Sequence, residues 1–255
     1  MTGRRRRLDL ELVRRSLAPS RTVAGELIDA GRVLVNGAPT ERASRLVDPA
    51  DAVTVLGPPA RFVGRGGDKL LAALQAFGDA AASVPGARAL DCGASTGGFT
   101  DCLLQHGACS VVALDVGHGQ LHERLRSDER VVVVERTNLR TVDPTSIGAP
   151  FDLVVADLSF ISLRTVAPAM VAMCQPVATM IVLVKPQFEV GRADAARGRG
   201  VIDDDALRHE ALTDVIDAFT ALGCTERGWI ESPIHGAEGN REFLVWFQAP
   251  PTEVV

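Results

Sequence analysis

Residues 89–104, with the sequence ALDCGASTGGFTDCLL, constrain the fold of this chain more than any other segment. An apolar stretch ends at Asp91, a glycine-bearing turn follows over 93–98, and the residues from Phe99 onward have helical spacing. A strand, a tight glycine turn and a helix in this order bring backbone N–H groups and a helix N-terminus up to a nucleotide-like ligand. The segment therefore predicts an α/β fold with a ligand site at this turn.

The turn matches neither of two common phosphate-binding motifs. A dinucleotide fingerprint GxGxxG that starts at Gly93 requires glycine at position 95, where the chain has Ser95. No Gly-Lys followed by Ser or Thr closes the turn, so it is not a P-loop. Gly97 and Gly98 would weaken a first helical turn, so we expect something to approach the backbone closely there. A purely structural turn is the alternative.

After residue 64 the chain alternates between apolar, strand-like segments and helical segments. Strands are predicted at 87–90, 110–114, 131–135, 151–156, 179–184, 228–232 and 242–248, and helices at 69–77 and 203–222. The alternating part is typical of a mostly parallel sheet covered by helices on both faces. The last two strands are close enough along the chain to pair antiparallel, and the segment 191–200, rich in Gly, Arg and Ala, is predicted to be a loop.

The first 59 residues predict a separate small α+β module. Its predicted parts are helices at 8–17 and 21–30 with Ser20 as the second N-cap and Gly31 after it, a strand at 33–35, a hairpin turn at 36–37 and a strand at 53–56. We expect this module to span 1–59, a linker 60–63, a larger domain 64–249 and a short tail 250–255.

Composition narrows the class of protein. The net charge is −5, yet the first 60 residues hold ten Arg against seven Asp or Glu, which favours a polyanionic partner for the small module. Five cysteines without a CxxC pair argue for a reducing compartment and against a structural zinc site. No apolar run is long enough to cross a bilayer, and no hydrophobic region of a signal peptide follows Arg4–Arg7. We therefore expect a soluble, cytoplasmic protein.

Polar residues follow the predicted parallel strands where each one ends. They are Asp91, Asp115, Asn138, Asp157 and Lys185. Because parallel strands bring their carboxyl ends to one edge of the sheet, we expect these side chains to share a crevice. Asp115 follows Asp91 at close to the roughly 20-residue interval at which an acid binds ribose hydroxyls in dinucleotide folds. Three strand-end acids and a glycine turn suit a nucleoside ligand.

Lys185 differs from the other strand-end residues because it is cationic. It follows the apolar run Met180–Val184 and precedes Pro186, so a buried strand delivers its amine to the crevice. Burial disfavours the charged form of an amine, which allows it to act as a general base. The alternative is a structural lysine whose stem covers apolar surface while its amine reaches solvent.

The chain resembles two known families. Residues 7–37 are similar to a small RNA-binding module first seen in a ribosomal protein, which implies phosphate contacts from Arg7, Arg14, Arg15, Arg21 and Arg32. The segments GRGGDKL, LDCGASTGGFT, ALDVGHGQL, ERTNLR, VVADLSFISL, LVKPQFEVG and GNREFLVWF resemble the TlyA family. These are S-adenosylmethionine-dependent ribosomal RNA methyltransferases, some labelled haemolysins, with a catalytic domain similar to FtsJ-type ribose 2′-O-methyltransferases.

The resemblance implies a Rossmann-like class I methyltransferase fold, a seven-stranded sheet with the last strand antiparallel, and 2′-O-methylation of a cytidine in ribosomal RNA without a metal ion. It implies a catalytic tetrad of Lys69, Asp157, Lys185 and Glu242, with Glu238 a competitor for the last role and Lys185 the preferred base. The implied S-adenosylmethionine contacts are Asp91, Gly93, Ser95, Gly97, Gly98, Phe99, Asp115, Asn138, Asp157 and Phe160.

Several alternatives stay open from the sequence. A membrane-active haemolysin, an RNA-binding protein with an inactive methyltransferase domain, and an enzyme acting on transfer RNA or a small molecule are other functions. The tail 249–255 is shorter than the helical C-terminus of dual-substrate members, while residues 1–6 resemble the longer N-terminal form, so one or both ribosomal subunits can be the substrate. The sequence does not predict the oligomeric state.

Overall fold

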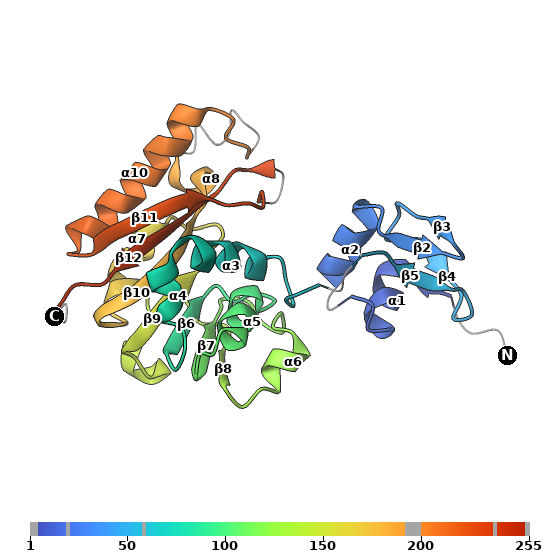
Figure 1. Ribbon diagram of the computed structural model, residues 1–255, viewed down its shortest axis with the longest axis horizontal. Helices are drawn as coiled ribbons and strands as arrows, with labels where there is room; N and C mark the ends of the chain where they lie inside the picture. Colours follow the sequence, from blue (N-terminus) through green and yellow to red (C-terminus); the bar gives the residue numbers. More distant parts are fainter. Residues whose placement is uncertain (1–4, 19–20, 58–59, 192–199, 237–238, 253–255) are drawn as a thin grey trace. The chain divides into compact units, whose positions relative to one another are not determined.

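The protein consists of two compact units, Met1–Arg65 and Gly66–Val255. The structure is a computed structural model that describes residues 5–18, 21–57, 60–191, 200–236 and 239–252. Figure 1 colours the first unit blue and the second from teal to red. The predicted N-cap Ser20, the competitor Glu238, most of the predicted loop 191–200 and the last residues of the tail lie outside the described residues.

The first unit packs two helices against short antiparallel strands. The elements are β1 (Arg6–Arg7), α1 (Leu8–Arg14), α2 (Arg21–Asp29), β2 (Val33–Val35), β3 (Ala38–Pro39), β4 (Leu46–Val47) and β5 (Val53–Val55). Strand β2 lies between β3 and β5, and β1 pairs with β4. The core consists of fully buried apolar side chains from the helices and strands, chiefly Leu8, Leu12, Ala24, Ile28, Val33, Val35 and Val47.

Backbone conformation sets the ends of these short elements. Helix α1 stops three residues before the predicted Leu17 because Ser16 has a φ of +55°, which the helix does not allow. Gly31 has a φ of +67° and closes α2, while the Arg32 N–H donates to the Leu27 carbonyl. The hairpin predicted at Asn36 and Gly37 is confirmed, with both residues at positive φ between the paired strands β2 and β3.

The second unit is built on one seven-stranded sheet. Its strands are β6 (Arg88–Cys92), β7 (Ser110–Leu114), β8 (Val131–Val134), β9 (Phe151–Ala156), β10 (Cys174–Val184), β11 (Thr225–Glu231) and β12 (Phe243–Gln248). Their order across the sheet is β11-β12-β10-β9-β6-β7-β8. Neighbours from β10 to β8 are parallel, and β12 is antiparallel to both β10 and β11. The predicted, mostly parallel sheet with an antiparallel last strand is confirmed.

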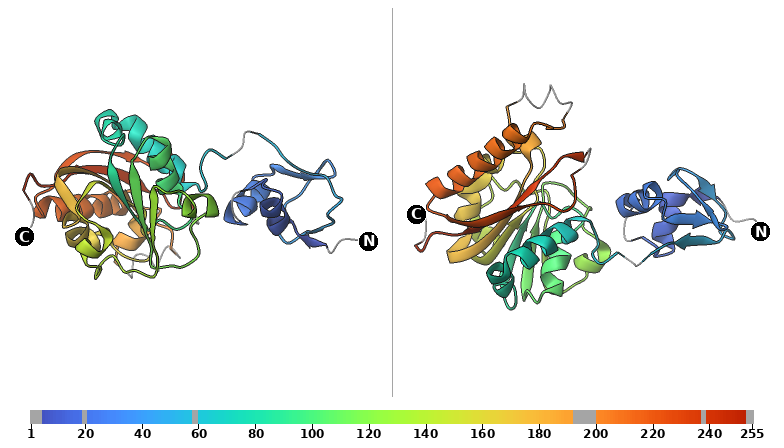
Figure 2. Two further views of the ribbon diagram at one scale, coloured as in Figure 1. Left: turned by 90° about the horizontal axis from the view of Figure 1, so that it is seen from below. Right: turned by 45° about the horizontal axis from the view of Figure 1, so that its top comes forward.

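Helices cover both faces of this sheet (Figure 2). The remaining elements are α3 (Gly66–Ala76), α4 (Gly78–Ala82), α5 (Gly98–Gln105), α6 (Glu123–Arg126), the 3₁₀ turn η1 (Pro144–Ile147), α7 (Leu163–Val171), α8 (Pro186–Glu189) and α10 (Asp205–Ala221). Helix α3 packs on α5, and α10 packs on α7 and α8. The main core includes Phe151, Met170, Phe219 and Phe247, all fully buried.

Strand β10 is longer than the sequence predicts. The predicted strand begins at Thr179, but pairing with β9 already starts at Cys174. Between Cys174 and Thr179 the register shifts, and Val177 has a φ of +58°. The sequence pattern did not predict residues 174–178 as part of the strand, because a proline, here Pro176, normally marks a strand end.

The strand order fixes where a ligand crevice can form. From β6 the chain moves to β7 and β8 on one side, and it then returns to β9 and β10 on the other side. At such a switch point, the connections after β6 and β9 leave the sheet in opposite directions and open a crevice at the carboxyl ends of the strands. The segments 93–98 and 157–162 follow those two strands.

Candidate active site

The glycine turn after β6 is held in place by neighbouring protein groups. The Gly93 and Ala94 N–H groups donate to the Leu114 carbonyl of β7. Gly93 has a φ of +85°, and a Cβ there would lie 2.8 Å from the backbone oxygen of Asp157. Gly97 has a φ of +96°, and a Cβ there would collide with Leu125. The side chains of Leu125 and Leu121 therefore account for a close approach at Gly97, and the cofactor contact predicted for this residue stays a prediction.

Asp91 stabilises the glycine turn by hydrogen bonds from β6 to Thr100 in α5. Its carboxyl group is fully buried, and Oδ2 accepts from the Thr100 N–H at 2.9 Å and from the Thr100 hydroxyl at 2.6 Å. Within the described residues Oδ1 has no hydrogen-bond partner. Burial raises the pKa of Asp91 to about 7, although the Thr100 hydroxyl opposes the shift. Asp91, which the sequence assigned to the cofactor, lines neither cavity of the crevice.

Two adjoining cavities occupy the crevice. The larger has a volume of about 610 Å³ and is lined by Gly93, Ser95, Leu114, Asp115, Val116, Gly117, Gln120, Asn138, Leu139, Asp157, Leu158, Ser159, Phe160, Ile161 and Val166. The smaller, of about 190 Å³, is lined by Gly66, Gly93, Ala94, Ser95, Thr96, Gly98, Phe99, Asp157, Ser159 and Lys185. Gly93, Ser95, Asp157 and Ser159 line both, so the cavities meet at these residues. Most of the predicted cofactor residues line one cavity or the other.

Asp115 is held rigidly at the end of β7. Its Oδ2 accepts from the Ser95 N–H at 2.8 Å, and its Oδ1 accepts from the Gly117 N–H at 2.6 Å. These bonds link the glycine turn to the loop after β7. Each carboxylate oxygen keeps a second lone pair for a ligand hydroxyl. Asn138 also lines the larger cavity, and its Oδ1 caps the Arg140 N–H at 3.0 Å.

Lys69 and Glu242 form a buried ion pair. The Lys69 Nζ lies 2.5 Å from Glu242 Oε2, and their side chains are 10% and 2% exposed. Helix α3 supplies the lysine, and the residue immediately before β12 supplies the glutamate. Glycine at position 236 is required because a Cβ there would collide with the Glu242 carboxylate. The structure thus joins two predicted tetrad members that are 173 residues apart.

Lys185 forms the second pair of the predicted tetrad. Its Nζ lies 2.6 Å from Asp157 Oδ1 and donates to the Ser159 hydroxyl at 3.0 Å. One member of each pair lies at the end of one of two adjacent strands, because Val184 of β10 is opposite Phe243 of β12. Lys185 and Glu242 come next in that register. Sequence analysis did not identify Ser159, although its position two residues after the strand-end Asp157 was the available signal.

The lysine content of the chain singles out the same two residues. The chain has 27 Lys and Arg residues, and only Lys69 and Lys185 are lysines. Arginine serves everywhere else as the cation. Arginine cannot be deprotonated in proteins, whereas an amine can donate or accept a proton according to its surroundings. Each amine pairs with one carboxylate, and the Lys185 amine also lies at the smaller cavity.

Phe160 stands at the rim of the larger cavity. It has a φ of +64° and is 91% exposed, and its ring packs against Phe188 with centroids 5.3 Å apart. A large apolar side chain with positive φ and almost full exposure is costly unless a ligand or partner uses it. Among the described residues, no cluster of three or more His, Cys, Asp or Glu could hold a metal ion.

The arginines predicted to bind RNA in the first unit all have intramolecular partners. Arg7 and Arg21 pair with Asp9, and Arg14 pairs with Glu11, yet these three side chains remain 44–59% exposed. The Arg32 Nε donates to the Leu56 carbonyl. Arg7, Arg14 and Arg21 therefore keep surface available for phosphate contacts.

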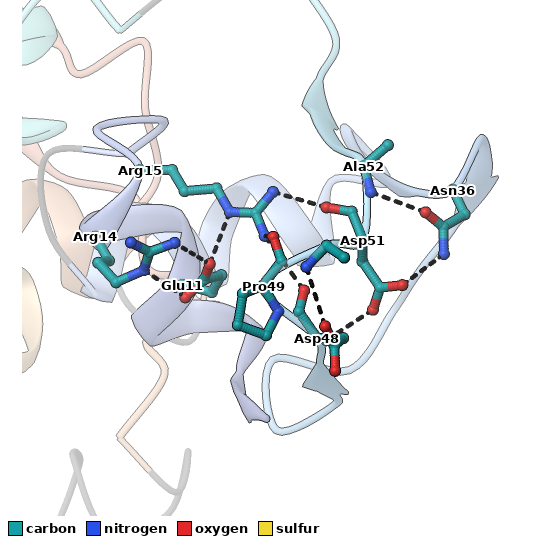
Figure 3. Close-up of polar contacts among 9 residues, drawn as sticks. Glu11, Arg14, Arg15, Asn36, Asp48, Pro49, Asp51 and Ala52 are labelled. Carbon is teal, nitrogen blue, oxygen red and sulfur yellow. Dashed lines mark hydrogen bonds and ion pairs between the residues drawn. The ribbon is translucent and has the colours of Figure 1, made fainter. Parts of the chain in front are cut away.

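Arg15 has a structural role that the sequence did not predict (Figure 3). Its guanidinium donates to Glu11 at 2.7 Å, to the Asp51 carbonyl at 2.7 Å and to the Pro49 carbonyl at 3.0 Å. The side chain is only 20% exposed. Because its donors are used to tie α1 to the loop before β5, Arg15 is a poor candidate for a phosphate contact.

Comparison with known proteins places the chain in a family. The profile described as FtsJ-like methyltransferase matches residues 62–249, and the S4 domain profile matches residues 6–53. A curated relative from Mycobacterium tuberculosis, the 16S/23S rRNA (cytidine-2′-O)-methyltransferase TlyA, is 50% identical over 96% of this chain and 91% of its own length. The chain belongs to the TlyA family of FtsJ-like methyltransferases. The predicted class I methyltransferase fold and family are confirmed.

Other TlyA-family relatives carry a different kind of name. Hemolysin A of Brachyspira hyodysenteriae is 40% identical over 94% of this chain and 99% of its own length. The solved structure of a candidate hemolysin from Streptococcus thermophilus is 34% identical, has a TM-score of 0.77 and covers 97% of this chain and 92% of that one. For the present chain, no helix within the described ranges is long and apolar enough to cross a membrane.

Proposed function

We propose that this TlyA-family protein transfers a methyl group from S-adenosylmethionine to the 2′-hydroxyl of a cytidine in ribosomal RNA, and therefore acts in the cytoplasm. The main supporting observation is that each of the chain's only two lysines pairs with a carboxylate, and that one member of each pair, Lys185 and Glu242, lies at the ends of the adjacent strands β10 and β12. Lys185 also lines a cavity that adjoins a nucleoside-sized one. The name of the M. tuberculosis relative supports the substrate and the position methylated.

The larger cavity fits S-adenosylmethionine. Its volume of about 610 Å³ falls within the range of roughly 300–1,000 Å³ of small-molecule sites. Two backbone amides fix the Asp115 carboxylate at the end of β7, where it can accept bonds from ribose hydroxyls. Gly93, Ser95, Asn138 and the apolar lining would enclose the rest of the ligand. The ligand's sulfonium supplies an activated methyl group, so the protein mainly has to position the acceptor and take its proton.

Lys185 is the proposed base. A ribose hydroxyl must lose its proton as its oxygen attacks, and a neutral amine beside the reacting oxygen can accept it. Lys69 is less suited because its amine is tied to Glu242 in an almost fully buried pair and lines neither cavity. The Lys69–Glu242 pair instead fixes the end of β12 beside Lys185. Asp157 orients Lys185 across the boundary between the two cavities.

We propose that Phe160 contacts the RNA. The sequence assigned it to the cofactor, but a ring that is 91% exposed at the rim is better placed to stack on a base that leaves its helix. Extrusion of the target nucleotide costs a few kcal/mol, and stacking on an aromatic ring recovers roughly 1–3 kcal/mol.

The first unit is proposed to hold ribosomal RNA by its phosphates. The two-stranded ribbon β1–β4 and the loop before β4 carry four exposed arginines, Arg5, Arg6, Arg42 and Arg45, which we call the ribbon arginines. Arg5 and Arg45 both lie close enough to lower the pKa of Asp51, although its Asn36 hydrogen bond is the largest cause. Such a group supplies affinity without base readout. It adds to the still-exposed Arg7, Arg14 and Arg21.

Methyl transfer to purified ribosomal subunits tests the proposed function. The full chain is incubated with labelled S-adenosylmethionine and with small or large subunits that lack the modification, and methylated riboses are mapped. We expect one or more 2′-O-methylcytidines, and the two separate substrates decide between one subunit and both. Lys185→Arg serves as the control because it keeps the charge and removes the base. Binding of RNA and cofactor without transfer would favour an inactive methyltransferase domain, and lysis of erythrocytes without transfer would favour the haemolysin alternative.

A further inference from the structure

The Ser159 hydroxyl lies where the catalytic amine, the cofactor cavity and the smaller cavity meet. Its Oγ accepts a hydrogen bond from the Lys185 Nζ at 3.0 Å, and the residue lines both cavities. Gly93, Ser95 and Asp157 are the other residues common to both linings. Of these four, Asp157 and Ser159 contact the amine.

The hydrogen-bond capacity of the amine shows what this contact can do. A neutral lysine amine has two N–H donors and one lone pair, and it can act as a base only through the lone pair. Ser159 Oγ accepts one of these donors at 3.0 Å, and the charged Asp157 Oδ1, the ion-pair partner 2.6 Å from Nζ, lies on the side of the other. When both donors are engaged, the lone pair must point in the remaining direction. With Asp157 alone, one N–H would be free to turn toward the substrate oxygen, and the lone pair would turn away.

We propose that Ser159 is a positioning residue that aims the lone pair of Lys185 at the ribose hydroxyl; this inference rests on the proposed function. The lone pair takes the hydroxyl proton while the ribose oxygen forms its bond to the methyl carbon and the carbon–sulfur bond breaks. The electron pair of that bond stays on sulfur, which becomes a neutral thioether. Lys185 leaves the step as an ammonium ion and then releases its proton to solvent.

The loop that carries Ser159 is anchored well enough for such a role. Glu189, at the end of α8, is almost fully buried, and its carboxylate accepts from the Ser162 hydroxyl at 2.5 Å and from the Leu163 N–H at 2.7 Å. These bonds tie the start of α7 to the short helix that begins directly after Lys185. The Phe160–Phe188 ring contact joins the same two segments. Ser159 and Lys185 are therefore held together by contacts on both sides of their own bond.

Three variants of the full chain separate positioning from general structural damage. Ser159→Ala removes the acceptor, and Ser159→Thr keeps a hydroxyl at the same position. Ser146→Ala is the matched control, because Ser146 is an exposed serine in η1 whose hydroxyl donates to the Asp143 carbonyl and which lines neither cavity. Each variant is assayed for kcat with saturating RNA and for the Kd of S-adenosylmethionine.

Lysine-selective labelling provides a direct readout of the contact. Protein grown with [¹³Cε]lysine gives two side-chain NMR signals, because Lys69 and Lys185 are the only lysines. The Lys69→Arg variant assigns them. A merely structural role of Ser159 would shift both signals or neither, whereas the proposed contact predicts a shift of the Lys185 signal alone.

We expect Ser159→Ala to lower kcat by roughly 10- to 100-fold, because it removes one hydrogen bond to a group that becomes charged in the reaction. The Kd of the cofactor should change by less than about threefold. Ser159→Thr should recover most of this loss, and Ser146→Ala should behave as wild type. A kcat for Ser159→Ala within about twofold of wild type, or an unmoved Lys185 signal, would overturn the inference. Absence of transfer by the wild-type protein would overturn the proposed function instead, and the NMR comparison would still test the Ser159–Lys185 contact.

Discussion

Replacing Asp91 by Asn tests the physical description of the glycine turn. In the folded protein this carboxyl group is fully buried, and burial raises its pKa to about 7 from an ordinary 3.8. Asn has nearly the same shape, and its side-chain oxygen can accept both Thr100 bonds. The substitution therefore removes the ability to ionise while it leaves the turn's main hydrogen bonds available.

The expected magnitude follows from the two pKa values. An acid whose pKa is raised on folding binds its proton more tightly in the native state, so its stabilising contribution is complete below pH 4 and is lost as the pH rises toward 7. A difference of about three pKa units corresponds to roughly 4 kcal/mol, of which about 3 kcal/mol falls between pH 5 and pH 8. The Asn variant lacks this dependence, so it should gain stability relative to wild type by about that amount over this pH range.

Tryptophan fluorescence can follow this unfolding selectively. The chain has two tryptophans, Trp229 in β11 and Trp246 in β12, so the signal reports only the second unit. Urea titrations at several pH values between 5 and 8 give the free energy of unfolding of wild type, Asp91→Asn and the control Asp217→Asn. Asp217 is an exposed residue of α10, and its variant should keep the wild-type pH dependence.

The pH dependence of the unfolding free energy is compared between the Asp91→Asn variant and wild type, because other titrating groups contribute equally to both proteins. If the difference in unfolding free energy between Asp91→Asn and wild type stays constant within about 1 kcal/mol from pH 5 to pH 8, burial does not perturb this carboxyl as described.

Three further predictions address the two lysines and the first unit. Lys185→Arg should reduce methyl transfer by at least about 100-fold with the cofactor Kd nearly unchanged in filter binding, and transfer above a tenth of wild type would refute the assignment of the base. Lys69→Met leaves Glu242 buried and unpaired, which should lower the unfolding free energy by about 3–5 kcal/mol. The double variant that also carries Glu242→Leu should recover most of this loss. If it recovers none, the pairing is contradicted. Arg15→Ala should speed amide hydrogen exchange in residues 5–57. Arg42→Ala should leave this exchange unchanged and should reduce the slope of log K for RNA binding against log salt concentration by about one unit. The opposite pattern would reverse the roles given to these two arginines.

Local patterns predicted the framework of the site well. The strand before Asp91, the glycine turn and the strand-end residues Asp115 and Lys185 were placed by hydrophobic period and turn chemistry, which depend on neighbouring residues only. The sequence did not identify Leu125 as the side chain that crowds Gly97, because Leu125 lies 28 positions away and reaches that glycine only after α6 folds back. The predicted α1 was too long and the predicted β10 was too short, because the amino-acid types around Ser16 and Val177 do not indicate that these two residues have positive φ.

The sequence by itself determined the order of helices and strands, the position of the glycine turn and the chemical types at the strand ends, because hydrophobic periodicity and backbone preferences act over a few residues. Only the tertiary structure decided which groups meet. The Lys69–Glu242 pair spans 173 residues and depends on the packing of α3 against β12. Other contacts between distant residues place Ser159 on Lys185 and use the donors of Arg15 inside the first unit. Those contacts are set by burial of the whole core, which no local segment encodes.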